Sequence, residues 1–530
     1  MRLHFNSCKV AILIATLLPL FVSNVGHGSD QRRDAEIHAD KGLRLAQAGN
    51  LPEAEIELRI AVQVVPDDAG FLSNLGTILA MERKLEDSTG VFERALRVDP
   101  KDVTTRRYLA ANLWQLHRYP EAKRNLEIIL NQAPNDKESR LLLGMVSENM
   151  KDYPTAIRML GSVPAQVRER PESIAALARS YYHLGQRKNA QRSLEELLTH
   201  PSGARGILLG AQVADEMKDY DTAEKLITAI TSQSTDQATV GYELALVQYH
   251  AKRFAESQRT LLSLISSGYK SSQAFNLLGW CYHEENQPAD AARAMQEAID
   301  LDPTQQSNYL DLEKILLASG SLPSALGAAK RASDRFPDSP LAFLMRGSIE
   351  LKMSQFTDAV VSYTRALRLD PANPDASLGL AEAQSNAGLD KEAVAGFEAA
   401  IRKFPQDPRF RLQYALMLLK LAESGNLSAE TRAERLLKSA VALTPPLPEV
   451  HYQLGDLAQK KNRTTEALAE FRHAAKLDPQ SAKVHFALGR IYRRLGRNAE
   501  AAREMDFYQR LKESESKAAM PPSGTGASQN

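Results

Sequence analysis

The densest group of chemically capable side chains in the sequence is the run at 280–285. His283 and Glu284 begin like the H-E-x-x-H motif, in which two histidines four residues apart on one helix hold a zinc ion. The fourth residue after His283 is Gln287, which cannot replace the second histidine. Cys281 is the only other soft ligand nearby, so we predict no metal site and interpret Cys281 as a small buried residue.

Other catalytic signatures are absent from the sequence. There is no G-x-x-x-x-G-K-[ST], no G-x-G-x-x-G and no G-x-S-x-G. The 66 basic side chains nearly balance the 65 acidic ones, so the chain has no general attraction to nucleic acid or anionic membranes. We therefore predict that the protein is not an enzyme, holds no cofactor and binds no nucleic acid.

The N-terminus is typical of a secretory signal peptide. Two basic residues precede an apolar run at 10–22, and small and polar residues follow, with a cleavage position after Gly28. The run is shorter than the ~20 residues of a membrane-spanning helix. We expect export to the periplasm, cell envelope or exterior, and no membrane span after cleavage at 1–28; an uncleaved anchor is the alternative. The mature chain would keep only Cys281, so it can form no internal disulfide.

The elements that would position any site are copies of one unit. Gly489 and Ala501 stand 34 residues after Gly455 and Ala467, and apolar residues recur around each at helical spacing. Each copy therefore reads as two short amphipathic helices. Gly455 and Ala467 are small because the two helices approach closely, and Pro479 ends the unit because proline cannot continue a helix.

Three series of residues carry this pattern through the chain with one step of 33 and one of 40. The small residue of the second helix recurs at Ala54, Ser88, Ala122, Ala156, Ala190, Ala223, Ser257, Ala291, Ala325, Ala359, Ala393, Ala433, Ala467 and Ala501. The first helix keeps the same register at Gly42, Gly76, Ala110, Gly144, Ala178, Ala211, Ala245, Gly279, Glu313, Gly347, Ala381, Ala415, Gly455 and Gly489. Prolines close nine of the fourteen units.

This spacing resembles the tetratricopeptide repeat (TPR), whose pattern is W-x2-L-G-x2-Y, then A-x3-F, then a terminal proline. The resemblance implies an all-α fold, an α-solenoid or superhelix of about fourteen TPR hairpins. We expect a signal peptide at 1–28, a lead-in at 29–34, repeats one to seven at 35–271, repeats eight to fourteen at 272–517 and a disordered tail at 518–530.

Two departures from the pattern lie in the second half of the array. Six additional residues in repeat twelve predict an exposed loop or a lengthened hairpin near 423–431. Glu313 places a charge where its counterparts are glycine or alanine. Either repeat nine is locally splayed or the carboxylate finds a partner.

The resemblance also implies where function lies, since the first helices of TPR hairpins line a concave groove. Aromatic anchors beside polar groups are enriched at protein interfaces. In repeats five to eight the groove positions include Arg179, Tyr182, His183, Tyr242, Tyr249, His250, Asn276, Trp280 and His283. We predict that these residues bind an extended segment or helix of a partner; the alternative is that they pack against adjacent helices.

A basic group, Arg490, Arg493, Arg494 and Arg497, lies in the last repeat. It would meet an acidic partner or an anionic surface, or it is a solvated helix face. We expect an exported scaffold or adaptor for protein–protein interactions, in cell-envelope or secretion assembly. The alternatives are a non-catalytic subunit of a carbohydrate-processing or polysaccharide-export complex and a self-assembling structural protein. The oligomeric state stays open.

Overall fold

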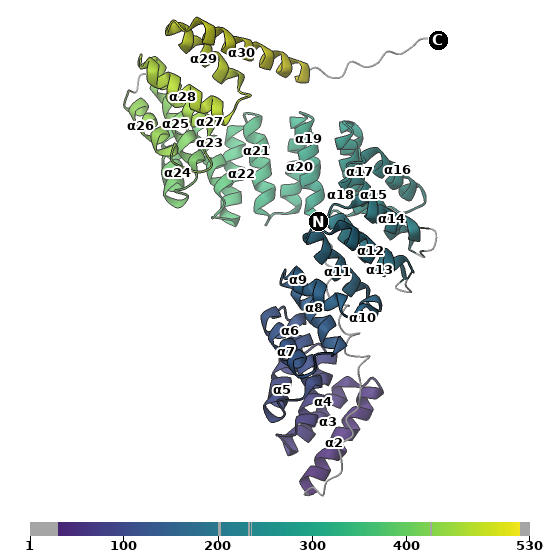
Figure 1. The fold of residues 1–530 in the computed structure, drawn as a ribbon. Helices are drawn as coiled ribbons and strands as arrows, with labels where there is room; N and C mark the ends of the chain where they lie inside the picture. The colour runs from purple at the N-terminus through teal and green to yellow at the C-terminus, as the bar shows by residue number, and fades with distance from the viewer. Residues whose placement is uncertain (1–29, 200–202, 232–233, 235, 424–426, 520–530) are drawn as a thin grey trace, which may run out of the picture. The chain divides into compact units, whose positions relative to one another are not determined.

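The computed structural model describes residues 30–199, 203–231, 234, 236–423 and 427–519, and its regular elements there are all helices (Figure 1). The predicted signal peptide and residues 520–530 of the predicted tail lie outside these ranges. No helix within them has the length and apolar character that crossing a membrane requires. The chain divides into two compact units, Met1–Lys270 and Ser271–Asn530, each described by itself.

The first unit consists of seven helical hairpins and one additional short helix. Its helices are α2 (Asp30–Gln47), α3 (Leu51–Val64), α4 (Ala69–Met81), α5 (Leu85–Val98), α6 (Val103–Gln115), α7 (Tyr119–Gln132), α8 (Lys137–Asn149), α9 (Tyr153–Gly161), α10 (Pro164–Arg168), α11 (Pro171–His183), α12 (Arg187–Thr199), α13 (Gly203–Glu216), α14 (Tyr220–Ile230), α15 (Gln237–His250) and α16 (Phe254–Ser266). The first helices of successive hairpins contact one another, from α2 through α4, α6, α8, α11 and α13 to α15. They therefore form one continuous layer.

The second unit consists of seven further hairpins. Its helices are α17 (Ser272–Glu284), α18 (Pro288–Leu301), α19 (Gln306–Ala318), α20 (Leu322–Arg335), α21 (Pro340–Lys352), α22 (Phe356–Leu369), α23 (Pro374–Asn386), α24 (Asp390–Lys403), α25 (Pro408–Glu423), α26 (Leu427–Ala440), α27 (Pro448–Lys460), α28 (Thr464–Leu477), α29 (Ala482–Arg494) and α30 (Asn498–Ala519). Fourteen hairpins in the described residues confirm the predicted all-α solenoid.

Recurring aspartates begin the early first helices. Asp68, Asp102 and Asp136 stand at steps of 34, each two residues after a closing proline. Their carboxylates accept backbone N–H groups of the first turns of α4, α6 and α8, at 3.0, 2.9 and 2.7 Å. Such N-caps satisfy donors that a helix start would otherwise leave unpaired. The proline thus ends one hairpin, and the aspartate starts the next.

Close packing inside each hairpin depends on a small residue facing a large one. A Cβ added at Gly76 would lie 2.6 Å from the ring of Phe92, and one at Gly455 would lie 2.7 Å from the ring of Phe471. The two phenylalanines are fully buried. The predicted reason for the glycines, close approach of the paired helices, is confirmed.

Three segments differ in detail from the sequence expectation. Residues 30–34, expected as a lead-in, are the first part of α2, where the Arg32–Glu36 ion pair at 3.4 Å supports the helix. Residues 518 and 519, expected in the tail, belong to α30. The short helix α10 was not predicted; α9 ends at Gly161, and Pro164 starts a new helix because proline fits a first turn.

The insertion in repeat twelve lengthens the hairpin. The helix α25 has 16 residues against 13 in α27, and Ala433 is the seventh residue of α26 whereas Ala467 is the fourth of α28. The six additional residues are therefore divided between the two helices. Of the two predicted alternatives, the lengthened hairpin is the one observed.

Repeat nine reverses the small-to-large pairing. Glu313 occupies the glycine position of α19, and the position in α20 equivalent to Phe92 is Ala329. The repeat is not splayed, since Glu313, Ala325 and Ala329 are each 0% exposed. Neither carboxylate oxygen of Glu313 has a hydrogen-bond partner among the described residues. Burial raises the pKa of Glu313 to about 8. The structure therefore matches neither predicted alternative, because the repeat is not splayed and the carboxylate has no hydrogen-bond partner among the described residues.

Candidate protein-interaction surface

The nine residues predicted to bind a partner all lie on first helices. Arg179, Tyr182 and His183 are on α11, Tyr242, Tyr249 and His250 are on α15, and Asn276, Trp280 and His283 are on α17. The first six belong to one compact unit and the last three to the other. The two groups are therefore described separately.

Arg179 joins three successive hairpins. Its Nη1 donates to Oε1 of Glu148 on α8 at 2.9 Å, and its Nε lies 3.8 Å from Oε2 of Glu216 on α13. Glu148 also accepts from Asn149 at 2.7 Å, and Asn149 accepts from the indole N–H of Trp114 on α6 at 2.7 Å. A continuous polar chain therefore runs across α6, α8, α11 and α13.

Tyr182 has an internal partner. Its hydroxyl donates to Oδ2 of Asp219 at 2.8 Å, and the buried Asp219 also accepts from Arg187 at 2.7 Å and from Gln191 at 2.9 Å. Burial acts to raise the pKa of Asp219, but these hydrogen bonds outweigh it and hold the pKa below its ordinary value. Burial and Asp219 together raise the pKa of Tyr182. Tyr182 thus contacts the next hairpin through Asp219, and its contact with a partner stays a prediction.

The two predicted histidines of this unit, His183 and His250, are exposed and are held in place by neighbours. His183 stacks on Tyr153 with ring centroids 4.3 Å apart. Nδ1 of His250 lies 2.8 Å from Oδ2 of Asp215 on α13. This hydrogen bond raises the pKa of His250 above its ordinary value, so the ring is oriented and carries positive charge over a wider pH range.

The remaining aromatic residues of α15 are half-buried. Tyr249 lies against Phe254, with ring centroids 5.4 Å apart. Burial raises the pKa of Tyr242 to about 12, so its hydroxyl stays protonated. The side chains of Tyr242 and Tyr249 are thus partly exposed to solvent and partly packed in the protein.

The residues of α17 connect to the next hairpin of their own unit. Nδ2 of Asn276 donates to Asn308 and to Asp311 on α19, each at 3.1 Å. Trp280 packs on the cluster that contains Leu312, and its ring meets that of His283 edge-on, 5.6 Å apart. Asn276 and Trp280 therefore contribute to packing between repeats eight and nine, and His283 contacts Trp280 on the same helix.

We call a set of residues on α11, α13 and α15 the first-helix ridge: Arg179, His183, Asp215, Glu216, Tyr249 and His250. The carboxylates of α13 join its two ends, because Glu216 faces Arg179 and Asp215 faces His250. The sequence analysis missed Asp215 and Glu216, although the repeat register places Asp215 at the position of Tyr249 one hairpin earlier. The ridge presents alternating aromatic, cationic and anionic groups to solvent.

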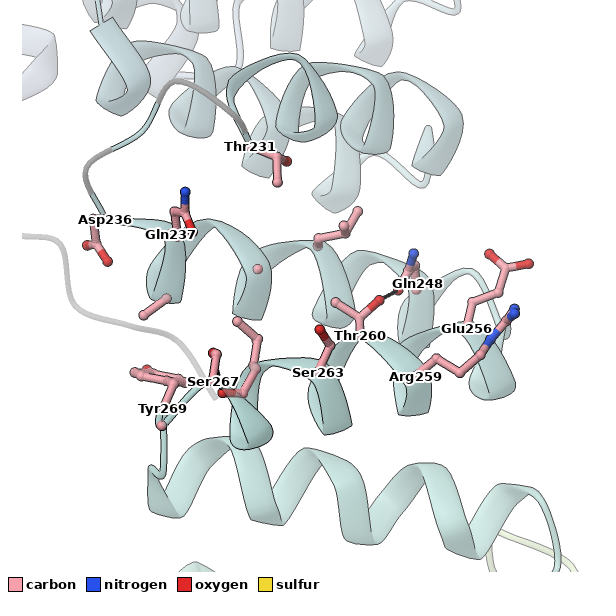
Figure 2. A pocket seen from close by; sticks show the side chains of 15 residues that line it. Thr231, Asp236, Gln237, Gln248, Glu256, Arg259, Thr260, Ser263, Ser267 and Tyr269 are labelled. Carbon is pink, nitrogen blue, oxygen red and sulfur yellow. Dashed lines mark hydrogen bonds between the residues drawn. The ribbon is translucent and has the colours of Figure 1, made fainter.

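A separate pocket of about 1100 Å³ lies in repeat seven and shares no residue with the ridge. Figure 2 shows Gln248 and Thr260 side by side in its lining, with Glu256 and Arg259 toward one end. The Thr260 hydroxyl donates to Oε1 of Gln248 at 2.8 Å. It is lined by Thr231, Asp236, Gln237, Ala238, Gly241, Leu244, Gln248, Glu256, Arg259, Thr260, Ser263, Leu264, Ser267, Gly268 and Tyr269. In the described residues no three His, Cys, Asp or Glu side chains are grouped so that they could hold a metal ion.

Comparison with protein families decides the nature of the array. One family model described as tetratricopeptide repeat matches residues 350–417, and a second with the same description matches residues 39–103, 242–305 and 452–514. The chain is a tetratricopeptide repeat protein. TPR arrays are scaffolds for protein–protein interaction, and this family is generally non-catalytic.

Three relatives illustrate how widely the array is shared. Human Superkiller complex protein 3 is 24% identical over 69% of this TPR chain and 25% of its own length. The type IV pilus assembly protein PilF of Pseudomonas aeruginosa is 28% identical over 37% of this chain and 78% of its own. Cellulose synthase operon protein C of Pseudomonas fluorescens is 23% identical over 80% of this chain and 34% of its own. The chain therefore spans about a quarter of the first relative and a third of the last.

Two solved structures align with most of this chain at low sequence identity. The crystal structure of yeast Tom70 aligns over 93% of this chain and 98% of its own, with 16% identity and a TM-score of 0.38. The Cut9–Hcn1 structure aligns over 84% of this chain and 87% of its own, with 18% identity and a TM-score of 0.34.

Proposed function

We propose that this TPR protein is an exported, non-catalytic scaffold whose first-helix ridge binds an extended segment of a protein partner. The observation that carries the proposal is the ridge itself. His183, Glu216 and His250 are exposed on three neighbouring first helices. His183 is held by stacking on Tyr153, and ion pairs join Glu216 to Arg179 and His250 to Asp215. A surface ordered before binding loses less conformational entropy when a partner is bound.

The chemistry of the ridge favours a partner segment with apolar and basic side chains. Glu216 is 62% exposed, and its contact with Arg179 is as long as 3.8 Å, so the carboxylate can accept a cation from a partner. The half-buried ring of Tyr249 on α15 supplies an apolar contact. Aromatic residues flanked by polar groups are typical of binding hot spots.

An envelope setting is supported by the N-terminal sequence and by two relatives. The apolar run at 10–22 favours export. One relative is named for type IV pilus assembly and another for the cellulose synthase operon. We infer a role in assembling an envelope structure. The similarity to cellulose synthase operon protein C over 80% of this chain favours, as the second candidate, a non-catalytic subunit of a polysaccharide-producing complex.

The test is affinity capture from the native envelope with quantitative mass spectrometry. The ridge variant combines Tyr249→Ala with His250→Ala, and the matched control combines Arg192→Ala with Thr228→Ala, exposed residues of the second helices α12 and α14. The proposal predicts that one partner is depleted at least tenfold with the ridge variant and kept with the control, provided that helicity and melting are unchanged. Equal recovery on both baits contradicts it.

A further inference from the structure

The last first helix of the array, α29, presents an unusual set of exposed side chains. Every exposed residue of α29 is a cation or a phenyl ring: Lys483, Phe486, Arg490, Arg493 and Arg494. The helix contains no acidic residue. The spacing of these residues places them along one stripe of the helix, opposite its buried apolar face. We call this set the α29 stripe.

The arginines of the α29 stripe lack carboxylate partners. Within the described residues no carboxylate lies within 4.0 Å of Arg490, Arg493 or Arg494, since the ion pairs of this region involve other side chains. Arg490 lies over the ring of Phe486 at 5.9 Å, and Arg494 donates to Oδ1 of Asn462 at 2.9 Å. By contrast, Arg497 is paired with Glu500. The cluster therefore keeps its positive charge uncompensated, although neighbouring cations on one helix face repel.

Helix-end electrostatics explains only part of the α29 stripe. Arg493 and Arg494 lie in the last turn, where cations interact favourably with the helix dipole. Arg490 and Lys483 lie at earlier turns, where this effect has faded. Phe486 is 38% exposed and rests on Tyr508 of α30, with ring centroids 5.1 Å apart. The contact with Tyr508 therefore leaves part of the Phe486 ring exposed, beside arginines that have no carboxylate partner among the described residues.

We propose that the α29 stripe binds an acidic segment of a protein partner, independently of the first-helix ridge. Phe486 and Tyr508 receive an apolar side chain, and Arg490, Arg493 and Arg494 receive carboxylates as charge-assisted hydrogen bonds. From Lys483 to Arg494 the stripe is roughly 17 Å long at the helical rise. That length matches about five residues of extended chain.

The other occupants fit less well. Residues 520–530 of this chain contain no acidic side chain, so the side chains of that segment do not complement the stripe. A nucleic acid would need basic charge across several repeats, but the preceding first helix, α27, carries Glu449 and Asp456. Lys483 is already paired with Glu449. The unpaired positive charge is thus confined to one helix, which suits a short acidic peptide better than a nucleic acid.

The experiment measures fluorescence anisotropy of a fluorescein-labelled peptide LEDEDE, with its amide counterpart LQNQNQ as the uncharged reference. The test variant combines Arg490→Glu with Arg493→Glu. The matched control combines Arg503→Glu with Arg510→Glu, exposed residues of α30 in the same hairpin. Both variants have the same net charge, and circular dichroism melting checks that both fold. A third variant, Phe486→Ala, tests the apolar contact.

We expect wild type and control to bind LEDEDE alike, the test variant to bind roughly tenfold or more weakly, and Phe486→Ala to fall between them. LQNQNQ should not bind. The proposal is overturned if wild type does not bind LEDEDE, or if both charge reversals weaken binding equally. It is also overturned if the test variant loses binding to phosphatidylglycerol vesicles while its peptide binding is unchanged, since the stripe would then be a membrane contact.

Discussion

Replacing the buried Glu313 by methionine should stabilise repeat nine, and the gain should grow as the pH rises. The carboxylate is 0% exposed, and neither oxygen is hydrogen-bonded among the described residues. Methionine fills a similar volume with an apolar, flexible side chain. The substitution therefore removes a desolvated acid and keeps the space opposite Ala329 filled.

The magnitude follows from the pKa of Glu313. Burial raises it from 4.5 to about 8, and one unit of difference corresponds to about 1.4 kcal/mol. Between these values the unfolded chain releases a proton that the folded chain keeps, so stability falls as the pH rises and levels off above pH 8. The methionine variant should therefore gain roughly 1 kcal/mol at pH 5 and roughly 3 kcal/mol at pH 7.

The assay is native-state hydrogen exchange of peptides from α19 and α20, read by mass spectrometry at several pH values. A local measurement is needed because long repeat arrays do not unfold in two states. After correction for the intrinsic exchange rate, protection gives the opening free energy of repeat nine. The expected result is that the opening free energy of repeat nine is larger in the variant than in wild type, by an amount that increases from pH 5 to pH 8.

Glu350 in the next hairpin provides the control. It is equally buried, but Arg346 donates to it at 2.8 Å and Ser362 at 2.6 Å. Glu350→Met should destabilise its repeat by about 2 kcal/mol, because it leaves two donors without an acceptor. The reasoning would be refuted if the opening free energies of Glu313→Met and wild type changed in parallel with pH, or if Glu313→Met lost protection from exchange.

Four further outcomes are expected. Gly76→Val should overpack repeat two, which costs about 2 kcal/mol of stability and lowers the melting temperature of the chain. Asp219→Ala leaves three hydrogen-bond donors without an acceptor, which costs about 3 kcal/mol and should speed amide hydrogen exchange of α14. Because the pKa of His250 is raised, its stabilising contribution is present below about pH 6.5 and is lost as the pH rises through the raised value. His250→Gln should therefore remove this pH dependence from the amide hydrogen exchange of α15. Mass spectrometry of the exported chain should find its N-terminus directly after Gly28; an intact N-terminus would contradict cleavage.

The repeat register made most of the fold predictable. Small residues, closing prolines and a step of 34 fix where each hairpin begins and which faces pack, as the close pairing of Gly76 with Phe92 shows. The helix α10 could not be predicted, because Pro164 permits either a loop or a new helix start. The division of the repeat-twelve insertion between two helices also depends on packing that spacing does not specify.

The candidate surface was predictable only in part. The register identified the positions on the first helices, but it did not show which side chains are used internally. Tyr182 is held by Asp219, 37 residues away, and Arg179 by Glu148, 31 residues away. Such pairings between hairpins depend on side-chain geometry across repeats. Asp215 occupies a register position equivalent to that of Tyr249, so a search of all equivalent positions would have found it.

The central claim is that the first-helix ridge contacts a protein partner, and site-specific photo-crosslinking in the native host tests it most directly. A benzophenone side chain is placed at His183 or Glu216 on the ridge, and at Arg192 or Thr228 on the second helices as controls. The account predicts one common crosslinked partner from both ridge positions and none from the controls. Crosslinks to that partner from the second helices alone would contradict it.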